Sequence, residues 1–197
     1  MDNSFCGKAS TYETRGAMLT GKAIKEAVLN KDIIITDYDE KRVNPNSYNM
    51  RLDPKLKVYR RNIFRPYLDM KERNPYKEII IPPGGLLLKP NRLYIGSTIE
   101  YNFTNKFIPM INGRSSAGRL GLSIHITAGF GDIGFGGKWT LEITVVEPLI
   151  VYPGEEICQV CWFVPHGNTS MQYNGRYDGQ MEATTSRFYL PKEEKYE

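Results

Sequence analysis

Short stretches in which apolar and polar residues alternate dominate the chain, and this period of two predicts β-strands with one buried face. The clearest stretch is 138–145, whose apolar face comprises Trp139, Leu141, Ile143 and Val145. The same alternation places Glu142 on the opposite face, away from the core. Residues 122–128 alternate in the same way, and their expected inward-facing residues are Leu122, Ile124, Ile126 and Ala128.

Other strands are separated by Pro, Gly and Asn residues, which are typical of turns. We expect them over 32–36, 44–52, 78–82, 85–89, 92–101, 106–112, 149–152 and 157–164. In the strand at 44–52, Tyr48, Met50 and Leu52 are expected to face the core. A single short helix is predicted over 21–30, with Thr20 as its N-cap. Many short strands with one helix predict a mainly β protein, either a sandwich or a barrel.

Three segments fall outside this pattern. Residues 1–17 are polar and aperiodic, so we interpret them as an N-terminal extension or an expression remnant, and 191–197 as a charged terminus. Residues 53–78 are rich in charge, Tyr and Pro. An RNA-binding strip is one interpretation of them, but the irregular spacing of the aromatic residues favours a solvated excursion between strands. Residues 18–190 are expected to form one domain.

Composition narrows the class of protein. The 197 residues are 41% hydrophobic and 24% charged, which suits one globular domain with a sizeable core. No apolar run approaches the roughly 20 residues that span a bilayer, and the start has no apolar secretory signal. The net charge of +4 is modest and no dense basic run predicts a nucleic-acid partner. Three cysteines argue against a disulfide framework, so we expect a cytoplasmic protein without a membrane or nucleic-acid partner.

Residues 113–142 hold the candidate chemistry. They contain a Gly-Arg-Ser-Ser turn at 113–116, a loop at 129–137 with five glycines around Asp132, and the sequence Thr-Leu-Glu at 140–142. Glycines let such a loop take positive φ and approach a ligand closely. Together with His-Ile-Thr-Ala-Gly-Phe-Gly-Asp at 125–132, this run resembles the core of the dCTP deaminases, within the dUTPase superfamily. The segment Ser-Tyr-Asn-Met-Arg-Leu at 47–52 resembles a further family segment, with Asn49 in place of an aspartate.

The resemblance implies a dUTPase-like distorted β-barrel of the β-clip or jelly-roll kind, with a short N-terminal helix. It also implies hydrolytic deamination of dCTP to dUTP and ammonia, which supplies precursors of dUMP and dTTP. Three alternatives stay open: a bifunctional enzyme that releases dUMP and pyrophosphate, a dUTP pyrophosphatase, and a non-catalytic nucleotide sensor. The Thr-Ala-Gly-Phe-x-Asp pattern is similar to the bifunctional members, whereas departures at Ala117, Ile133 and Arg176 motivate the sensor.

The resemblance also assigns roles to individual residues. Glu142 corresponds to the general base and acid, with Ser115, Arg119 and the backbone of Ala128 around the attacking water. Asp132 corresponds to the ligand of the deoxyribose 3′-hydroxyl, and Phe135 closes the sugar pocket. The remaining substrate-binding residues fall into two sets. Those of the triphosphate clamp, expected to be shared between subunits, are Arg114, Ser116, Tyr173, Arg176 and Gln180. Those that read the base edge are Gln159 and the backbone of Thr140, Leu141 and Glu142.

Zinc chemistry is disfavoured by the residues themselves. Zinc deaminases use His-x-Glu with Pro-Cys-x-x-Cys, and this chain has only His125 and His166, neither in that pattern. Cys158 and Cys161 are three apart on a predicted strand, so we interpret them as two buried structural cysteines, and His125 as a satisfied strand histidine. Magnesium is expected to bind with the triphosphate, without protein side-chain ligands. The resemblance further implies a homotrimer, with dTTP as a candidate feedback inhibitor.

Overall fold

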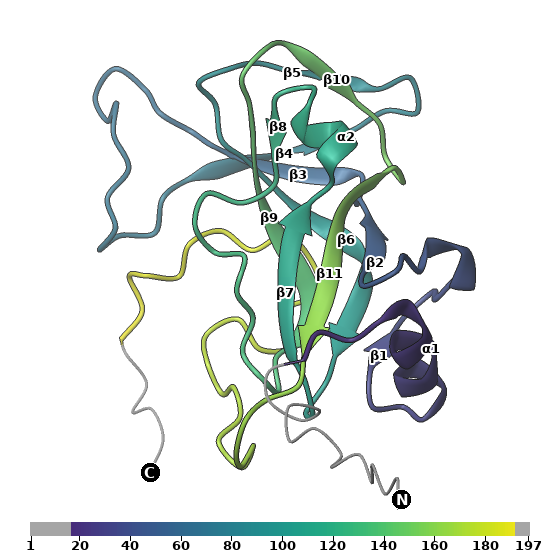
Figure 1. Ribbon diagram of the computed structural model, residues 1–197. Helices are drawn as coiled ribbons and strands as arrows, with labels where there is room; N and C mark the ends of the chain where they lie inside the picture. Colours follow the sequence, from purple (N-terminus) through teal and green to yellow (C-terminus); the bar gives the residue numbers. More distant parts are fainter. Residues whose placement is uncertain (1–16, 192–197) are drawn as a thin grey trace, which may run out of the picture.

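The computed structural model describes residues 17–191, and antiparallel β-strands are its main regular elements (Figure 1). The helical elements are α1 (Gly21–Leu29), the 3₁₀ helix η1 (Glu40–Arg42) and the one-turn α2 (Ser115–Gly118). The strands are β1 (Ile34–Ile35), β2 (Tyr48–Arg51), β3 (Lys55–Tyr59), β4 (Tyr76–Ile80), β5 (Leu86–Leu88), β6 (Tyr94–Phe103), β7 (Ile108–Gly113), β8 (Leu122–Ser123), β9 (Gly136–Val145), β10 (Leu149–Val151) and β11 (Glu156–Phe163). The expectation of a mainly β protein with a short N-terminal helix is confirmed.

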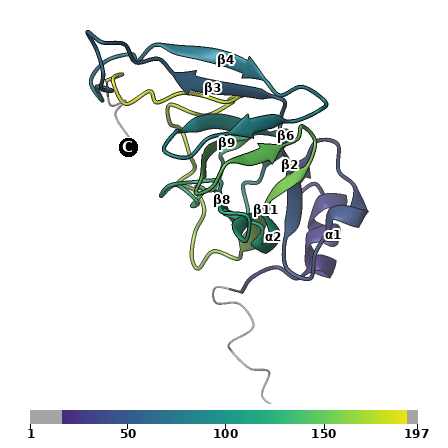
Figure 2. The same cartoon turned by 90° about the horizontal axis from the view of Figure 1, so that it is seen from above.

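The strands form three sheets. The largest has the order β4-β3-β6-β9-β8, and β1 also pairs with β6. A second sheet has the order β2-β11-β7, and β10 pairs with β5 in a two-stranded ribbon. Figure 2 shows the large sheet as one layer over the layer that contains β2 and β11, with α1 beside β2. Within residues 17–191 these sheets do not join into a single closed barrel.

The core lies between these layers and follows the predicted alternation. On β9 the four residues predicted to face inward are all buried: Trp139, Leu141, Ile143 and Val145. On β2 and just after it, Tyr48, Met50 and Leu52 are completely buried, as expected. Trp162 of β11 is also fully buried among them. The burial of one face of each strand therefore fixes which residues face outward.

Helix α1 closes one edge of this core. The Thr20 hydroxyl accepts a hydrogen bond from the Ala23 amide, which confirms the predicted N-cap. Ile24 and Ala27, three residues apart on one helical face, are the buried residues of the helix. The short apolar stripe is thus sufficient to attach the helix to the sheets.

A buried ion cluster joins η1, β2 and β6. The Glu100 carboxylate is completely buried and accepts hydrogen bonds from Arg42, from the Arg51 amide at 3.0 Å and from Arg51 Nε at 2.7 Å. Arg51 also pairs with the exposed Asp37, and Arg51 holds the pKa of that carboxyl below its usual range. Because a buried carboxylate is costly without partners, these contacts tie the three elements into one arrangement.

Two sequence predictions were wrong in detail. Residues 53–78 are not all a solvated excursion, because β3 and the start of β4 lie within them. Leu56 and Val58 are buried on β3, and the intervening Lys57 is buried as well. The lysine breaks the apolar run in the sequence, and for this reason the strand was not predicted. The strand predicted over 122–128 also ends early, at Ser123. Ile126 and Ala128 are exposed rather than inward-facing.

Candidate active site

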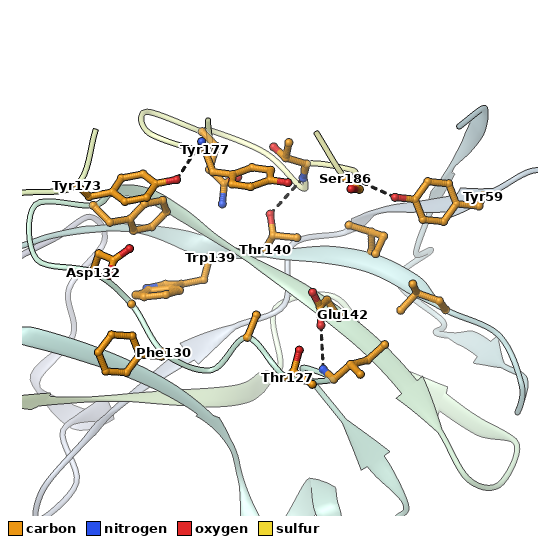
Figure 3. Close-up of a pocket in the computed structure, with 18 residues that line it drawn as sticks. Tyr59, Thr127, Phe130, Asp132, Trp139, Thr140, Glu142, Tyr173, Tyr177 and Ser186 are labelled. Atoms are coloured by element: carbon orange, nitrogen blue, oxygen red, sulfur yellow. Dashed lines mark hydrogen bonds between the residues drawn. The ribbon is translucent and has the colours of Figure 1, made fainter. Parts of the chain in front are cut away.

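A cleft of about 610 Å³ opens between β9, the glycine-rich loop and the C-terminal tail (Figure 3). Its volume is within the range of small-molecule sites. Seven of the predicted site residues line it: Ala128, Asp132, Phe135, Thr140, Glu142, Tyr173 and Gln180. The structure therefore brings together residues that are up to 52 positions apart, as 180 minus 128 gives.

Glu142 lies on the floor of this cleft. The alternation along β9 turns its side chain to the cleft while Leu141 and Ile143 enter the core. Its Oε2 accepts a hydrogen bond from the Ile126 amide at 2.9 Å (Figure 3). Its own amide donates to the Ile124 carbonyl at 2.8 Å. The Ile126 amide thus serves the carboxylate instead of continuing the β8 ladder, which explains why the strand predicted there is short. One carboxylate oxygen is held in place by the backbone.

The opposite end of the cleft is aromatic. Phe135 is buried and its ring lies 5.2 Å from that of Trp139 and 5.7 Å from that of Tyr173. Asp132 is exposed and projects beside these rings (Figure 3). At Gly131 a Cβ atom would collide with the Trp139 ring, so the loop can approach β9 this closely only with glycine. A carboxylate beside an apolar wall suits a ligand that presents a hydrogen-bond donor next to an apolar surface.

The C-terminal tail forms the upper wall by pairing with the strand that carries Glu142. Gln180 Nε2 donates to the Lys138 carbonyl at 2.8 Å, and the Lys138 amide donates to the Gln180 carbonyl at 2.9 Å. The Thr184 amide donates to Thr140 Oγ1 at 3.2 Å, and the Ser186 amide donates to the Tyr59 hydroxyl at 3.0 Å. The tail is therefore ordered on its own chain, and burial raises the pKa of its Tyr173.

Sequence reasoning missed several residues of the cleft. They are Tyr59, Leu93, Ile95, Ile126, Thr127, Phe130, Gly131, Trp139, Tyr177, Thr184 and Ser186. For Trp139 a signal existed, because it precedes Thr-Leu-Glu on the same strand. For Tyr59 there was none, because it lies in the stretch interpreted as an excursion and reaches the cleft only through the pairing of β3 with β6.

A lysine-glutamate contact anchors the tail to β3. Glu182 Oε1 accepts from Lys57 Nζ at 2.9 Å, and its Oε2 lies 3.3 Å from Lys55 Nζ. The Lys57 side chain is only 5% exposed, whereas that of Glu182 is 54% exposed. The Lys57 ammonium, hydrogen-bonded to Glu182, holds the pKa of that carboxyl below its usual range. The contact therefore joins a buried cation to a tail residue.

A Glu182→Gln variant tests this anchor through pH. Because the folded-state pKa is lowered, the stabilisation is present above the unfolded pKa of about 4.3 and disappears as pH falls through the lower folded value. At pH 7 we expect the free energy of unfolding of the variant to be up to about 1 kcal/mol smaller than that of the wild type. The effect is limited to this size because Glu182 is largely exposed to solvent. At pH 3 the difference should shrink, which urea unfolding at both pH values measures. An equal difference at both pH values would contradict the ionic origin, and Glu147→Gln is an exposed control.

Other predicted site residues lie outside this cleft. Arg114 and Ser116 line a separate cavity of about 240 Å³, where Arg114 Nη1 lies 3.1 Å from Glu156 Oε2 and 2.8 Å from the Glu156 carbonyl oxygen. Ser115 and Arg119 are exposed at either end of α2. Within one chain, the described residues thus do not bring these four side chains together with Glu142.

Three more predicted residues do not line the cleft. The Leu141 side chain is fully buried, because the alternation that exposes Glu142 turns its neighbour inward. Gln159 is held by Ser47 Oγ at 2.8 Å and donates to the Gly113 carbonyl at 3.1 Å. Arg176 Nη1 donates to the Arg187 carbonyl at 3.2 Å, so it braces the tail. The roles proposed for the backbone of 140–142 stay predictions.

The cysteines and His125 have structural surroundings. Cys158 and Cys161 are both buried, as predicted, and burial raises the pKa of both thiols. His125 is not the satisfied residue we expected, because its Nδ1 is buried without a hydrogen-bond partner in the described chain. Over 17–191, no group of three or more His, Cys, Asp and Glu side chains could hold a metal ion. No helix in the same range has the length and apolarity to cross a membrane.

A cleft with a fixed carboxylate on its floor and an aromatic wall is the arrangement of an enzyme's substrate site. Comparisons with known proteins agree: a family model described as dCTP deaminase-like matches residues 18–163. The chain belongs to this dCTP deaminase-like family and is an enzyme of that type. The family resemblance seen in the sequence is thereby confirmed.

Curated relatives cover nearly the same length of chain. One from Clostridium beijerinckii is 50% identical over 172 residues, which are 87% of this chain and 96% of the relative. One from Hathewaya histolytica is 53% identical over 160 residues, covering 81% of this chain and 90% of the relative. One from Leptospira biflexa is 49% identical over 178 residues, which cover 90% of this chain and 99% of the relative. All three are named "dCTP deaminase, dUMP-forming".

A solved structure shows the same fold. The crystal structure of 2′-deoxycytidine 5′-triphosphate deaminase from Agrobacterium tumefaciens superposes with a TM-score of 0.60 at 21% identity. The match covers 77% of this chain and 49% of the Agrobacterium tumefaciens chain. At this identity the likeness concerns the fold alone, and it agrees with the dUTPase-like architecture expected from the sequence.

Proposed function

We propose that this enzyme deaminates dCTP and releases dUMP, pyrophosphate and ammonia. The observation that carries the proposal is Glu142, fixed on the cleft floor by the Ile126 amide. The names of the relatives support dUMP over dUTP as the final product. From the sequence we expected dUTP as the product and kept dUMP as an alternative. The proposal now takes dUMP as the product.

In the proposed deamination, Glu142 accepts a proton from water as the water oxygen attacks C4 of the cytosine ring. That proton passes to N3 of the ring, and the remaining hydroxyl proton at C4 is then transferred to the amino group. The C4–N bond breaks, ammonia leaves, and the oxygen that stays on C4 becomes a carbonyl. The fixed Oε2 keeps the carboxylate in one orientation, so the other oxygen is the one that exchanges protons. The exposed backbone at Ala128, also at the cleft, is placed to bind the same water.

Asp132 and Phe135 are proposed to receive the deoxyribose. A carboxylate that accepts a hydrogen bond from the 3′-hydroxyl, beside a ring packed on Trp139 and Tyr173, leaves little room for a 2′-hydroxyl. In the second step, water attacks the α-phosphorus and the bond to the bridging oxygen breaks, so pyrophosphate leaves and dUMP remains. Asp132 and Glu142 are the two acidic residues that line the cleft, and Asp132 is proposed to orient this water.

Magnesium is proposed to enter with the triphosphate as part of the substrate. Phosphate oxygens and water supply most of the ligands that magnesium prefers, so a protein carboxylate cluster is not required. Tyr173, Arg176 and Gln180 of the tail are proposed to contact the phosphates. Two buried free thiols suit a reducing compartment, and we propose the cytoplasm. dTTP, which shares the sugar and triphosphate, is proposed as an inhibitor.

We also propose a homotrimer with sites between copies. Arg114, Ser115, Ser116 and Arg119 lie away from the cleft of their own chain, yet a triphosphate needs cations. A neighbouring copy can supply them at the cleft of the first, which closed cyclic symmetry repeats at every interface. Apolar side chains exposed around α2 and β10, among them Leu120 and Ile150, suit such a contact.

The products of one reaction test the proposed function. Purified enzyme is incubated with dCTP and magnesium at neutral pH, and the mixture is analysed by ion-exchange chromatography together with an ammonia assay. We expect ammonia, dUMP and pyrophosphate in equal amounts and no build-up of dUTP. Accumulation of dUTP would show a deaminase that stops after the first step. Pyrophosphate from dUTP without ammonia from dCTP would indicate a pyrophosphatase, and tight binding without any product a sensor.

A further inference from the structure

A second cavity, of about 600 Å³, adjoins the active-site cleft on the side of Tyr59. It lies between the end of β3, the loop that follows it, and the turn at 89–93 that joins β5 to β6. Tyr59 and Leu93 line both cavities, so one wall separates them. The proposed reaction assigns no role to any residue of this second cavity.

The lining of this cavity is positively charged. It includes Arg61, Lys89 and Arg92 and no carboxylate. Among the ion pairs of the described residues, none involves these three cations. Like charges that converge on one hollow without a counter-charge repel one another and attract an anion.

The cationic turn packs on the buried Tyr94. Tyr94 is 3% exposed, and the Arg92 guanidinium lies over its ring at 5.6 Å from the centroid. The Tyr94 hydroxyl accepts a hydrogen bond from the Lys89 amide at 2.9 Å. Asn91, between the two cations, has φ 58°, a conformation that asparagine tolerates better than most residues. One buried tyrosine thus fixes the backbone at Lys89 and carries the Arg92 guanidinium on its ring, and such preorganisation lowers the cost of binding an anion.

The other walls are apolar. Val58 is buried, and Leu68 and Leu93 complete the surface with Tyr59. We propose that this cavity binds a phosphate-bearing ligand, with its phosphates at Arg61, Lys89 and Arg92. Two sources share this chemistry: inorganic pyrophosphate and a nucleoside polyphosphate. The second would also place its base against the apolar wall.

Tyr59 links this cavity to the tail. Its hydroxyl accepts from the Ser186 amide, and Ser186 also lines the cleft. A ligand that packs against the Tyr59 ring restrains the side chain that holds the tail in place. A ligand in the second cavity therefore stabilises the C-terminal tail in its position along the active-site cleft.

Calorimetric titration with sodium pyrophosphate and, separately, with ATP tests the proposal. The wild type is compared with Arg61→Gln/Lys89→Gln, whose exposed side chains leave the fold intact, and with Lys22→Gln on α1 as a control that also removes positive charge from an exposed site. We expect saturable binding of at least one probe, weakened at least about tenfold in the double variant and unchanged in the control, because charge-assisted hydrogen bonds are lost. Tighter binding of ATP than of pyrophosphate would identify a nucleotide as the ligand. Equal affinities for the two probes would identify a polyphosphate without a base.

Equal affinity of the double variant and the control would overturn the proposal, because binding would then belong to the cleft or to general surface charge. Absence of saturable binding of both probes would overturn it as well. Hydrogen exchange gives a second readout that needs no catalysis. At saturation with the bound probe, the Ser186 amide should exchange more slowly in the wild type and in Lys22→Gln, but not in the double variant. Unchanged exchange in the wild type would overturn the link to the tail.

Discussion

A Glu142→Gln variant is expected to release ammonia from dCTP at least about a thousandfold more slowly than the wild type. General acid-base groups contribute factors of this order, and an amide can neither accept the proton of the attacking water nor return it. The carboxamide oxygen can still accept the hydrogen bond from the Ile126 amide, so the cleft keeps its shape. Coupled assay of ammonia under saturating dCTP measures the loss.

Glu147→Gln is the matched control. It makes the same chemical change five residues along the chain, at an exposed position after β9, and should leave the rate within about twofold of wild type. Calorimetric binding of dCTP to Glu142→Gln should be retained, which separates lost chemistry from lost binding. Ammonia release by Glu142→Gln at a rate similar to the control would remove Glu142 from the proposed mechanism.

Mixing two inactive variants should restore activity. Arg114→Ala lacks the cation proposed to reach a neighbouring copy's cleft, and Glu142→Gln lacks the carboxylate in its own. When the two are unfolded together and reassembled in equal amounts, about a quarter of the interfaces combine both wild-type residues, from random assembly in a closed ring. We therefore expect about a quarter of the wild-type rate, measured as ammonia release per active-site equivalent.

The chain offers a sharp control for this experiment. Asp132 and Glu142 line one cleft of the same chain, so Asp132→Ala mixed with Glu142→Gln leaves no interface with both residues. That mixture should stay inactive under the same conditions. Recovery in the second mixture, or none in the first when mass spectrometry shows mixed oligomers, would contradict a site shared between copies. A monomer by light scattering would exclude the assembly itself.

The predictable part of the fold was set by local burial. On β9 the buried residues alternate with cleft residues, so the position of Glu142 followed from period alone. The strand β3 was missed because Lys57 is buried among Leu56 and Val58, and a buried lysine needs a distant partner, Glu182, that no local pattern contains. Residues 122–128 kept the period of two beyond the strand, because the Ile126 amide bonds a side chain rather than a neighbouring strand.

The predictable part of the site came from the contiguous motif. Asp132, Phe135 and Glu142 meet in the cleft because one loop and one strand carry them all. The tail residues Thr184 and Ser186 could not be chosen, since their places depend on backbone bonds to Thr140 and Tyr59 from a segment without periodicity. Arg119 lies away from the cleft of its own chain, so its proposed place beside the ligand depends on a neighbouring copy.

The alternation along β9 has a consequence for how such an enzyme can change over time. Replacing Thr140 alters the cleft surface and the contact with the Thr184 amide while Leu141 and Trp139 keep the interior packed, so substrate preference can drift by point substitution without repacking of the core. Deleting or inserting one residue within the strand has the opposite effect, because every later side chain exchanges faces. We therefore expect diverging relatives to vary in the side chains of this strand but to keep its length.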